Sequence, residues 1–126
     1  MNGRVVHFEV PFDDGARAKG FYRDVFGWTY HEMADFGYTG VATGPTGEDG
    51  MPSEPGFIGG GMFQRQAPVE VPVITLDVED IDATLEQVTA HGGSVVDGKM
   101  AIGDMGFAAY FRDSEGNLMG LWQNAG

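Results

Sequence analysis

Residues 7–14 of the chain read His7-Phe8-Glu9-Val10-Pro11-Phe12-Asp13-Asp14, and residues 73–80 read Val73-Ile74-Thr75-Leu76-Asp77-Val78-Glu79-Asp80. The second stretch begins 66 positions after the first, and the same spacing places Gly27 on Gly93. In both stretches a strand-like pattern leads into acidic residues of the kind that cap helices. The chain therefore contains an internal repeat of strand, acidic turn, amphipathic helix, glycine and further strands.

The pattern beyond each repeat start predicts the remaining elements. Apolar residues recur at helical spacing between Asp14 and Gly27 and again between Asp80 and His91, so we expect a helix in each interval. Runs rich in β-branched and aromatic residues predict the strands. These runs cover residues 5–10, 28–33, 38–43, 57–64, 73–78, 95–100, 107–112 and 118–123. A chain of 126 residues is long enough for one domain, which we expect to span residues 1–126.

Composition excludes several classes of function. The chain has no cysteine, so disulfides and thiolate metal sites are absent. Its formal charge of −12 repels phosphate backbones and anionic lipids, which argues against nucleic acid and membrane partners and favours cationic ligands. No apolar run approaches the roughly 20 residues of a membrane span, and we expect a cytoplasmic protein. The same acidity also has a simpler explanation in solubility.

Three further segments carry a family resemblance. They are Phe21-Tyr22 followed by Phe26-Gly27-Trp28, then residues 77–83, and then Asp113-Ser114-Glu115-Gly116-Asn117 before a terminal apolar strand. In this order they resemble the vicinal oxygen chelate superfamily, the group of glyoxalase I, bleomycin resistance proteins and extradiol dioxygenases. The resemblance implies an α+β fold of two tandem βαβββ modules, at about residues 4–65 and 71–124, each with a cupped mixed sheet. It also implies a homodimer.

The resemblance implies metal-ligand positions, and most of them lack a ligand here. Metal-dependent members take ligands from the first and last strands of each module. The first-strand positions correspond to His7 and Val73. A match of residues 61–64 with residues 120–123 puts the end-strand positions, usually acidic, at Gly61 and Gly120. His7 alone is retained, so no bound metal or other cofactor is expected, beyond a weakly held divalent ion.

Glu9 lies two residues beyond His7 on the same strand, so both side chains face the same side. Such a pair could transfer a proton, orient a ligand or hold a metal weakly, because a carboxylate tunes the pKa of an imidazole near neutral pH. Alternatively, His7 and Glu9 form a hydrogen-bonded unit that lines a wet cavity and has no chemical role. The sequence leaves these alternatives open.

The two glycines at the ligand positions also allow two interpretations. They could mark strong bends in a cupped sheet, or they could empty the cavity so that a flat organic group lies against the backbone. Strand alternation puts Phe63 on the side of Gly61, and Trp122 on the side of Gly120. Both aromatic residues could line a ligand site or simply pack in the core.

The favoured function is therefore a small-molecule-binding protein of the glyoxalase/bleomycin resistance type, without a catalytic metal. Its ligand would be cationic or aromatic. The predicted contacts are His7, Glu9, Gly61, Phe63, Gly120 and Trp122. The alternative is a lyase, isomerase or dioxygenase of the same superfamily, and the sequence leaves open whether the protein is an enzyme. Acid–base catalysis by His7 and Glu9 would be its metal-independent form.

Overall fold

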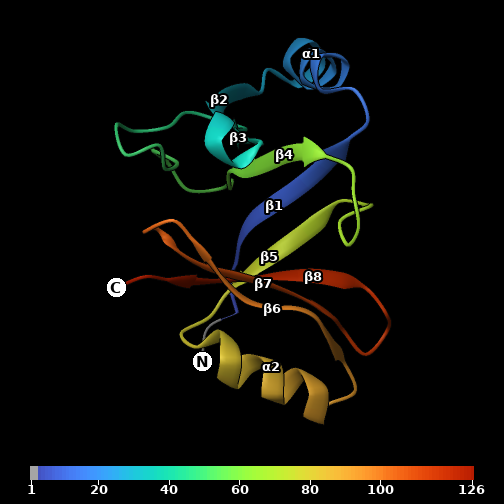
Figure 1. Cartoon of the computed structure of the whole chain (residues 1–126). Coiled ribbons are helices and arrows are strands. Elements are labelled where there is room, and N and C mark those ends of the chain that lie inside the picture. Colours follow the sequence, from blue (N-terminus) through green and yellow to red (C-terminus); the bar gives the residue numbers. More distant parts are fainter. Residues whose placement is uncertain (1–2) are drawn as a thin grey trace. The chain divides into compact units, whose positions relative to one another are not determined.

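The computed structural model describes residues 3–126, apart from the side chain of Ala34. The chain forms two compact units (Figure 1). One unit is His7–Pro72, and the other is Val73–Gly126 together with the N-terminal residues up to Val6. Within the second unit, the backbone of residues 3 and 4 hydrogen bonds to Asp77.

The first βαβββ module runs from β1 to β4. Its elements are β1 (Val5–Phe12), α1 (Gly15–Phe26), β2 (Thr29–Met33), a 3₁₀ turn η1 (Ala34–Phe36), β3 (Tyr38–Ala42) and β4 (Gly60–Gln64). The strand order is β2-β3-β4-β1. Strand β1 is parallel to β4, whereas the other neighbours are antiparallel. The sheet is therefore mixed.

The second module repeats this topology. Its elements are β5 (Val73–Asp77), α2 (Ile81–Ala90), β6 (Ser94–Ile102), β7 (Gly106–Arg112) and β8 (Leu118–Asn124). The order β5-β8-β7-β6 again pairs the first and last strands in parallel. Glu9 lies beside Gly61 in the first module, and Thr75 lies beside Gly120 in the second. This correspondence confirms both sequence alignments and the predicted α+β class.

The helix ends follow the local signals in the sequence. The side chains of Asp14 and Asp80 accept hydrogen bonds from the backbone N–H groups of Arg17 and Ala83, as N-caps do. Helix α1 ends at Gly27, whose φ of 77° lies in the left-handed region that glycine adopts without strain. Neither helix in residues 3–126 is long and apolar enough to cross a membrane.

Helix α2 covers one face of its own sheet, where it contacts β6, β7 and β8 (Figure 1). Five buried residues form the core between α2 and these strands. They are Ile81, Leu85, Ala109, Phe111 and Leu121. In β5 the side chains of Val73 and Thr75 are buried, whereas Ile74 between them is 44% exposed.

Helix α1 departs from the expectation that its apolar stripe covers a core. None of its twelve residues, all of which the structure describes, is buried. Phe21, Val25 and Phe26 are 55%, 58% and 61% exposed. Tyr22 turns toward the sheet, where its ring stacks on Trp28 with 4.3 Å between centroids, and Trp28 in turn contacts Phe8.

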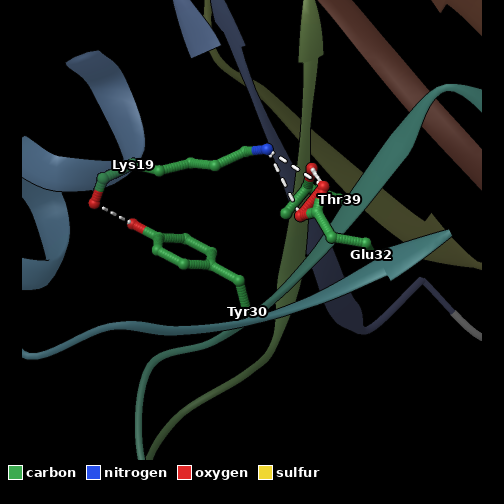
Figure 2. Close-up of polar contacts among 4 residues, drawn as sticks. All are labelled: Lys19, Tyr30, Glu32 and Thr39. Atoms are coloured by element: carbon green, nitrogen blue, oxygen red, sulfur yellow. Dashed lines mark hydrogen bonds and ion pairs between the residues drawn. The ribbon is translucent and has the colours of Figure 1, made fainter. Parts of the chain in front are cut away.

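Polar contacts at Lys19 attach α1 to β2 and β3 (Figure 2). The Lys19 ammonium donates to both carboxylate oxygens of Glu32 at 3.0 and 3.2 Å, and the Thr39 hydroxyl donates to the same carboxylate. The Tyr30 hydroxyl donates to the Lys19 carbonyl at 2.8 Å. The hydrogen bond from Lys19 lowers the pKa of Glu32. These residues lie on the face of the sheet that α1 contacts, so they fix the helix rather than form part of the candidate site.

Candidate functional site

Strand β1 places His7 and Glu9 on the face of the sheet opposite α1. Phe8, between them, points the other way, toward Trp28. The parallel pairing of β1 with β4 puts Gly61 directly beside Glu9, and Phe63 two residues further along the same face. Four of the six residues predicted from the sequence are therefore brought together on one face of the first module.

A fifth residue, Tyr38 at the start of β3, completes this group. Its hydroxyl oxygen lies 2.6 Å from His7 Nε2, and the hydroxyl donates to Glu9 Oε2 at 3.4 Å. Its ring stacks on Phe63, with 5.6 Å between centroids and 20° between planes. The Tyr38 phenol thus bridges the predicted His–Glu pair. We refer to His7, Glu9, Tyr38, Gly61 and Phe63 as the Tyr38 cluster.

The absence of a side chain at Gly61 makes room for Tyr38. A Cβ atom placed on Gly61 would fall inside van der Waals contact of the Tyr38 hydroxyl and ring. The glycine does not leave an empty space next to the strand, because the phenol occupies it. Gly61 therefore accommodates a neighbouring aromatic ring. This role differs from both predicted ones, a bend in the sheet and an emptied cavity.

Burial sets the protonation state of His7. It lowers the pKa of the imidazole below its ordinary value of 6.5, so the ring is neutral at pH 7. Neutral imidazole has one N–H and one acceptor nitrogen. While the Tyr38 hydroxyl donates to Glu9, its oxygen accepts from His7, which then carries its proton on Nε2. The arrangement is a chain of hydrogen bonds from imidazole to phenol to carboxylate.

The corresponding positions of the second module hold a different set of residues. Val73 and Thr75 replace His7 and Glu9, and both are buried. The Thr75 hydroxyl lies 2.8 Å from where a Cβ on Gly120 would be, so here too a neighbouring side chain fills the space beside the glycine. Trp122 is on the same face of β8 as Gly120, and its Nε1 donates to Asn124.

The metal-ligand set implied by the superfamily resemblance does not fit these residues. Val73, Gly61 and Gly120 offer no side-chain donor, and the Nε2 atom of His7 is in a short hydrogen bond to Tyr38. Structural and catalytic zinc centres use three or four protein ligands. Neither module by itself presents such a set at these positions.

The sequence pattern places Tyr38 in the strand predicted for residues 38–43 but does not indicate that it belongs to the site. It is 31 positions from His7 along the chain, and the pairing of β3 with β4 brings the two together. Gly61 is the one feature of the sequence that could have indicated this contact. A glycine on the site face of a strand indicates close approach of a neighbouring group, and Tyr38 is the largest residue in the neighbouring strand.

Comparison with known proteins agrees with this architecture. Residues 4–44 match the family model "Bleomycin resistance protein-like N-terminal". The chain is 34% identical over 123 residues to a Mycobacterium tuberculosis protein named putative glyoxylase CFP32; the match covers 91% of this chain. It covers 43% of that relative, so the chain spans less than half the relative's length.

Solved structures share the fold at low sequence identity. One is a glyoxalase/bleomycin resistance protein/dioxygenase superfamily member from Vibrio splendidus, with a TM-score of 0.61, 17% identity, and coverage of 98% of this chain and 99% of that one. Another is a methylmalonyl-CoA epimerase from Streptomyces coelicolor, with a TM-score of 0.64, 18% identity and full coverage of both chains. Together with the two βαβββ modules, these likenesses show that the chain has the fold of the glyoxalase/bleomycin resistance proteins.

Proposed function

We propose that this protein binds a small organic molecule at the Tyr38 cluster without a catalytic metal. The observation that carries the proposal is the short contact between His7 Nε2 and the Tyr38 hydroxyl, because it engages the one retained imidazole at the metal-ligand positions. The surrounding groups suit an organic ligand. Phe63 and Tyr38 offer aromatic surface, and Glu9, Tyr38 and His7 offer convergent polar atoms.

The charge of the chain favours a cationic ligand. Glu9 is buried within the cluster, and the protein as a whole carries a formal charge of −12. His7 adds no positive charge at pH 7, because burial lowers its pKa. A cation with a flat apolar part would gain both the attraction of this field and contact with the aromatic rings. In the same proposal the protein is cytoplasmic and forms a homodimer. Gly120 and Trp122 remain predicted ligand contacts of the second module, considered by itself.

The metal part of the proposal predicts weak or absent binding of divalent ions to the wild-type protein. The chelator-treated protein should be titrated calorimetrically with Ni²⁺, Mn²⁺, Fe²⁺ and Zn²⁺. No site should have a dissociation constant below about 100 μM, which corresponds to a binding free energy of about 5 kcal/mol. The His7→Ala variant is the control for binding elsewhere on the acidic surface. Stoichiometric binding that is tighter than this limit and lost in His7→Ala would refute a metal-free site.

The ligand part predicts a preference for positive charge on an aromatic ring. Benzamidine and benzoate have the same ring and opposite charges. We expect benzamidine to bind about tenfold more tightly, a difference of about 1.4 kcal/mol. Chemical-shift titration can measure fragment affinities and locate the affected residues. The Glu9→Gln variant keeps the side-chain shape and should reduce the preference for benzamidine over benzoate. Equal affinities of the wild type for the two compounds, or chemical-shift changes only outside the Tyr38 cluster, would contradict a cation-binding site at this cluster.

An acid–base lyase or isomerase is the second candidate function. It is favoured by the hydrogen-bonded chain of His7, Tyr38 and Glu9, since a neutral imidazole can accept a proton from a substrate. The distinguishing measurement is turnover on a confirmed substrate. Retention of full activity by both His7→Ala and Glu9→Ala would exclude this mechanism.

A further inference from the structure

Three donor positions converge on the hydroxyl oxygen of Tyr38. His7 and Glu9 alternate along β1 and face the same side, and position 61 on β4 lies beside Glu9. The Tyr38 oxygen is 2.6 Å from His7 Nε2 and 3.4 Å from Glu9 Oε2. The Tyr38 oxygen also lies closer than van der Waals contact to a Cβ atom placed on Gly61. The hydroxyl thus occupies the point that all three positions could reach.

An ion held by these positions would need the same space. Zinc lies about 2.0–2.1 Å from an imidazole nitrogen and about 2.0–2.2 Å from a carboxylate oxygen. The Tyr38 oxygen stands only 2.6 Å from His7 Nε2, so no room remains for an ion between them. A carboxylate side chain at position 61 and the phenol are also mutually exclusive, because even a Cβ there meets the Tyr38 ring.

The phenol is held in this place from several directions. Tyr38 follows Gly37, whose φ of 61° lets the chain turn sharply out of η1 into β3. Phe63 stacks on one face of the Tyr38 ring. The His7 ring is nearly parallel to the Tyr38 ring, with 14° between their planes. A ring restrained by stacking and by two hydrogen bonds is a fixed part of the site.

We propose that Tyr38 is the positioning residue that closes this site to divalent cations and replaces an ion as the group that orients His7 and Glu9. A ligand that reaches this point meets the phenol hydroxyl rather than a Lewis acid, so recognition is by hydrogen bonding and ring contact. The inference rests on the proposed metal-free function, since it names the residue that makes the site metal-free.

The test is to reopen the site by substitution. The double variant Tyr38→Ala/Gly61→Glu removes the phenol and supplies a carboxylate beside His7 and Glu9. The matched control, Tyr38→Phe/Gly61→Glu, supplies the same carboxylate but retains an aromatic ring that competes with it for the same space. In calorimetric titration of chelator-treated protein with Ni²⁺ alone, we expect the first variant to bind one ion about tenfold or more tightly than the wild type. The control should not gain this affinity, and adding His7→Ala to the first variant should abolish the gain.

Two results would overturn the inference. One is a folded Tyr38→Ala/Gly61→Glu variant, judged by circular dichroism, that binds Ni²⁺ no better than the wild type. The other is a Phe control that binds equally well. If the carboxylate variants do not fold, Tyr38→Ala alone provides the test: the His7–Glu9 pair should then bind Ni²⁺ measurably more tightly than in the wild type, and an unchanged affinity would refute the role of Tyr38. Tight binding by the wild type would instead refute the proposed metal-free function.

Discussion

Replacing Gly61 by alanine will destabilise the protein by about 2 kcal/mol, within the range of about 1–3 kcal/mol for overpacking a filled site. The added Cβ meets the hydroxyl and ring of Tyr38. The ring cannot move away freely, because it is stacked on Phe63 and hydrogen bonded to His7 and Glu9. The free energy of unfolding, measured by urea titration at pH 7, should fall accordingly.

Two controls separate this effect from the general cost of changing a strand glycine. Gly98 lies in β6, and a Cβ atom placed on it would meet open space, so Gly98→Ala should be close to neutral. In a Tyr38→Ala background, Gly61→Ala should lose most of its cost, because the atoms it would meet are gone. A double-mutant cycle then gives a coupling energy of about 1–2 kcal/mol between positions 38 and 61. Additive effects, or equal costs at Gly61 and Gly98, would show that Tyr38 does not fill this space.

The elements could be predicted from the sequence because their signals are local. Aspartates at positions 14 and 80 and glycine at position 27 mark helix ends within a few residues, and the structure confirms all three. Strand alternation is equally local, and it correctly put His7 with Glu9 on one face. Because the same order of strand, helix and further strands occurs twice in the sequence, the internal repeat also predicted two modules of the same topology.

The contacts of Tyr38 could not be predicted in the same way. They depend on the register between β3 and β4, in which Gly40 lies beside Gly61, and this pairing is not encoded by either strand alone. The loop of residues 43–59 separates the two strands, and a connection of this length does not fix the register as a tight hairpin turn would. The sequence therefore predicts the His–Glu pair but not the phenol that bridges it.

The two helices illustrate a second limit. Periodicity shows which residues share a face of a helix, but it does not show whether another element covers that face. Both helices have apolar residues at helical spacing. In α2 this face is in contact with the sheet and includes the buried Ile81 and Leu85, whereas in α1 Phe21, Val25 and Phe26 remain more than half exposed.

This difference predicts unequal effects of truncating the two helices. Leu85→Ala should lower the free energy of unfolding by about 3 kcal/mol, because it removes a buried side chain and leaves a cavity among Ile81, Phe111 and Leu121. Val25→Ala should change it by about 0.5 kcal/mol or less, since Val25 is 58% exposed and alanine is the better helix former. Urea unfolding of both variants under the same conditions makes the comparison.

The result for Val25 is informative in either direction. A small effect means that the apolar stripe of α1 contributes little to folding of the isolated chain, and that the attachment of α1 depends on Lys19, Tyr30 and the stacked Tyr22 and Trp28. A loss at Val25 comparable to that at Leu85 would mean that the stripe is buried in solution. A dependence of that loss on protein concentration would then identify the covering surface as a second copy of the chain, because only association links stability to concentration.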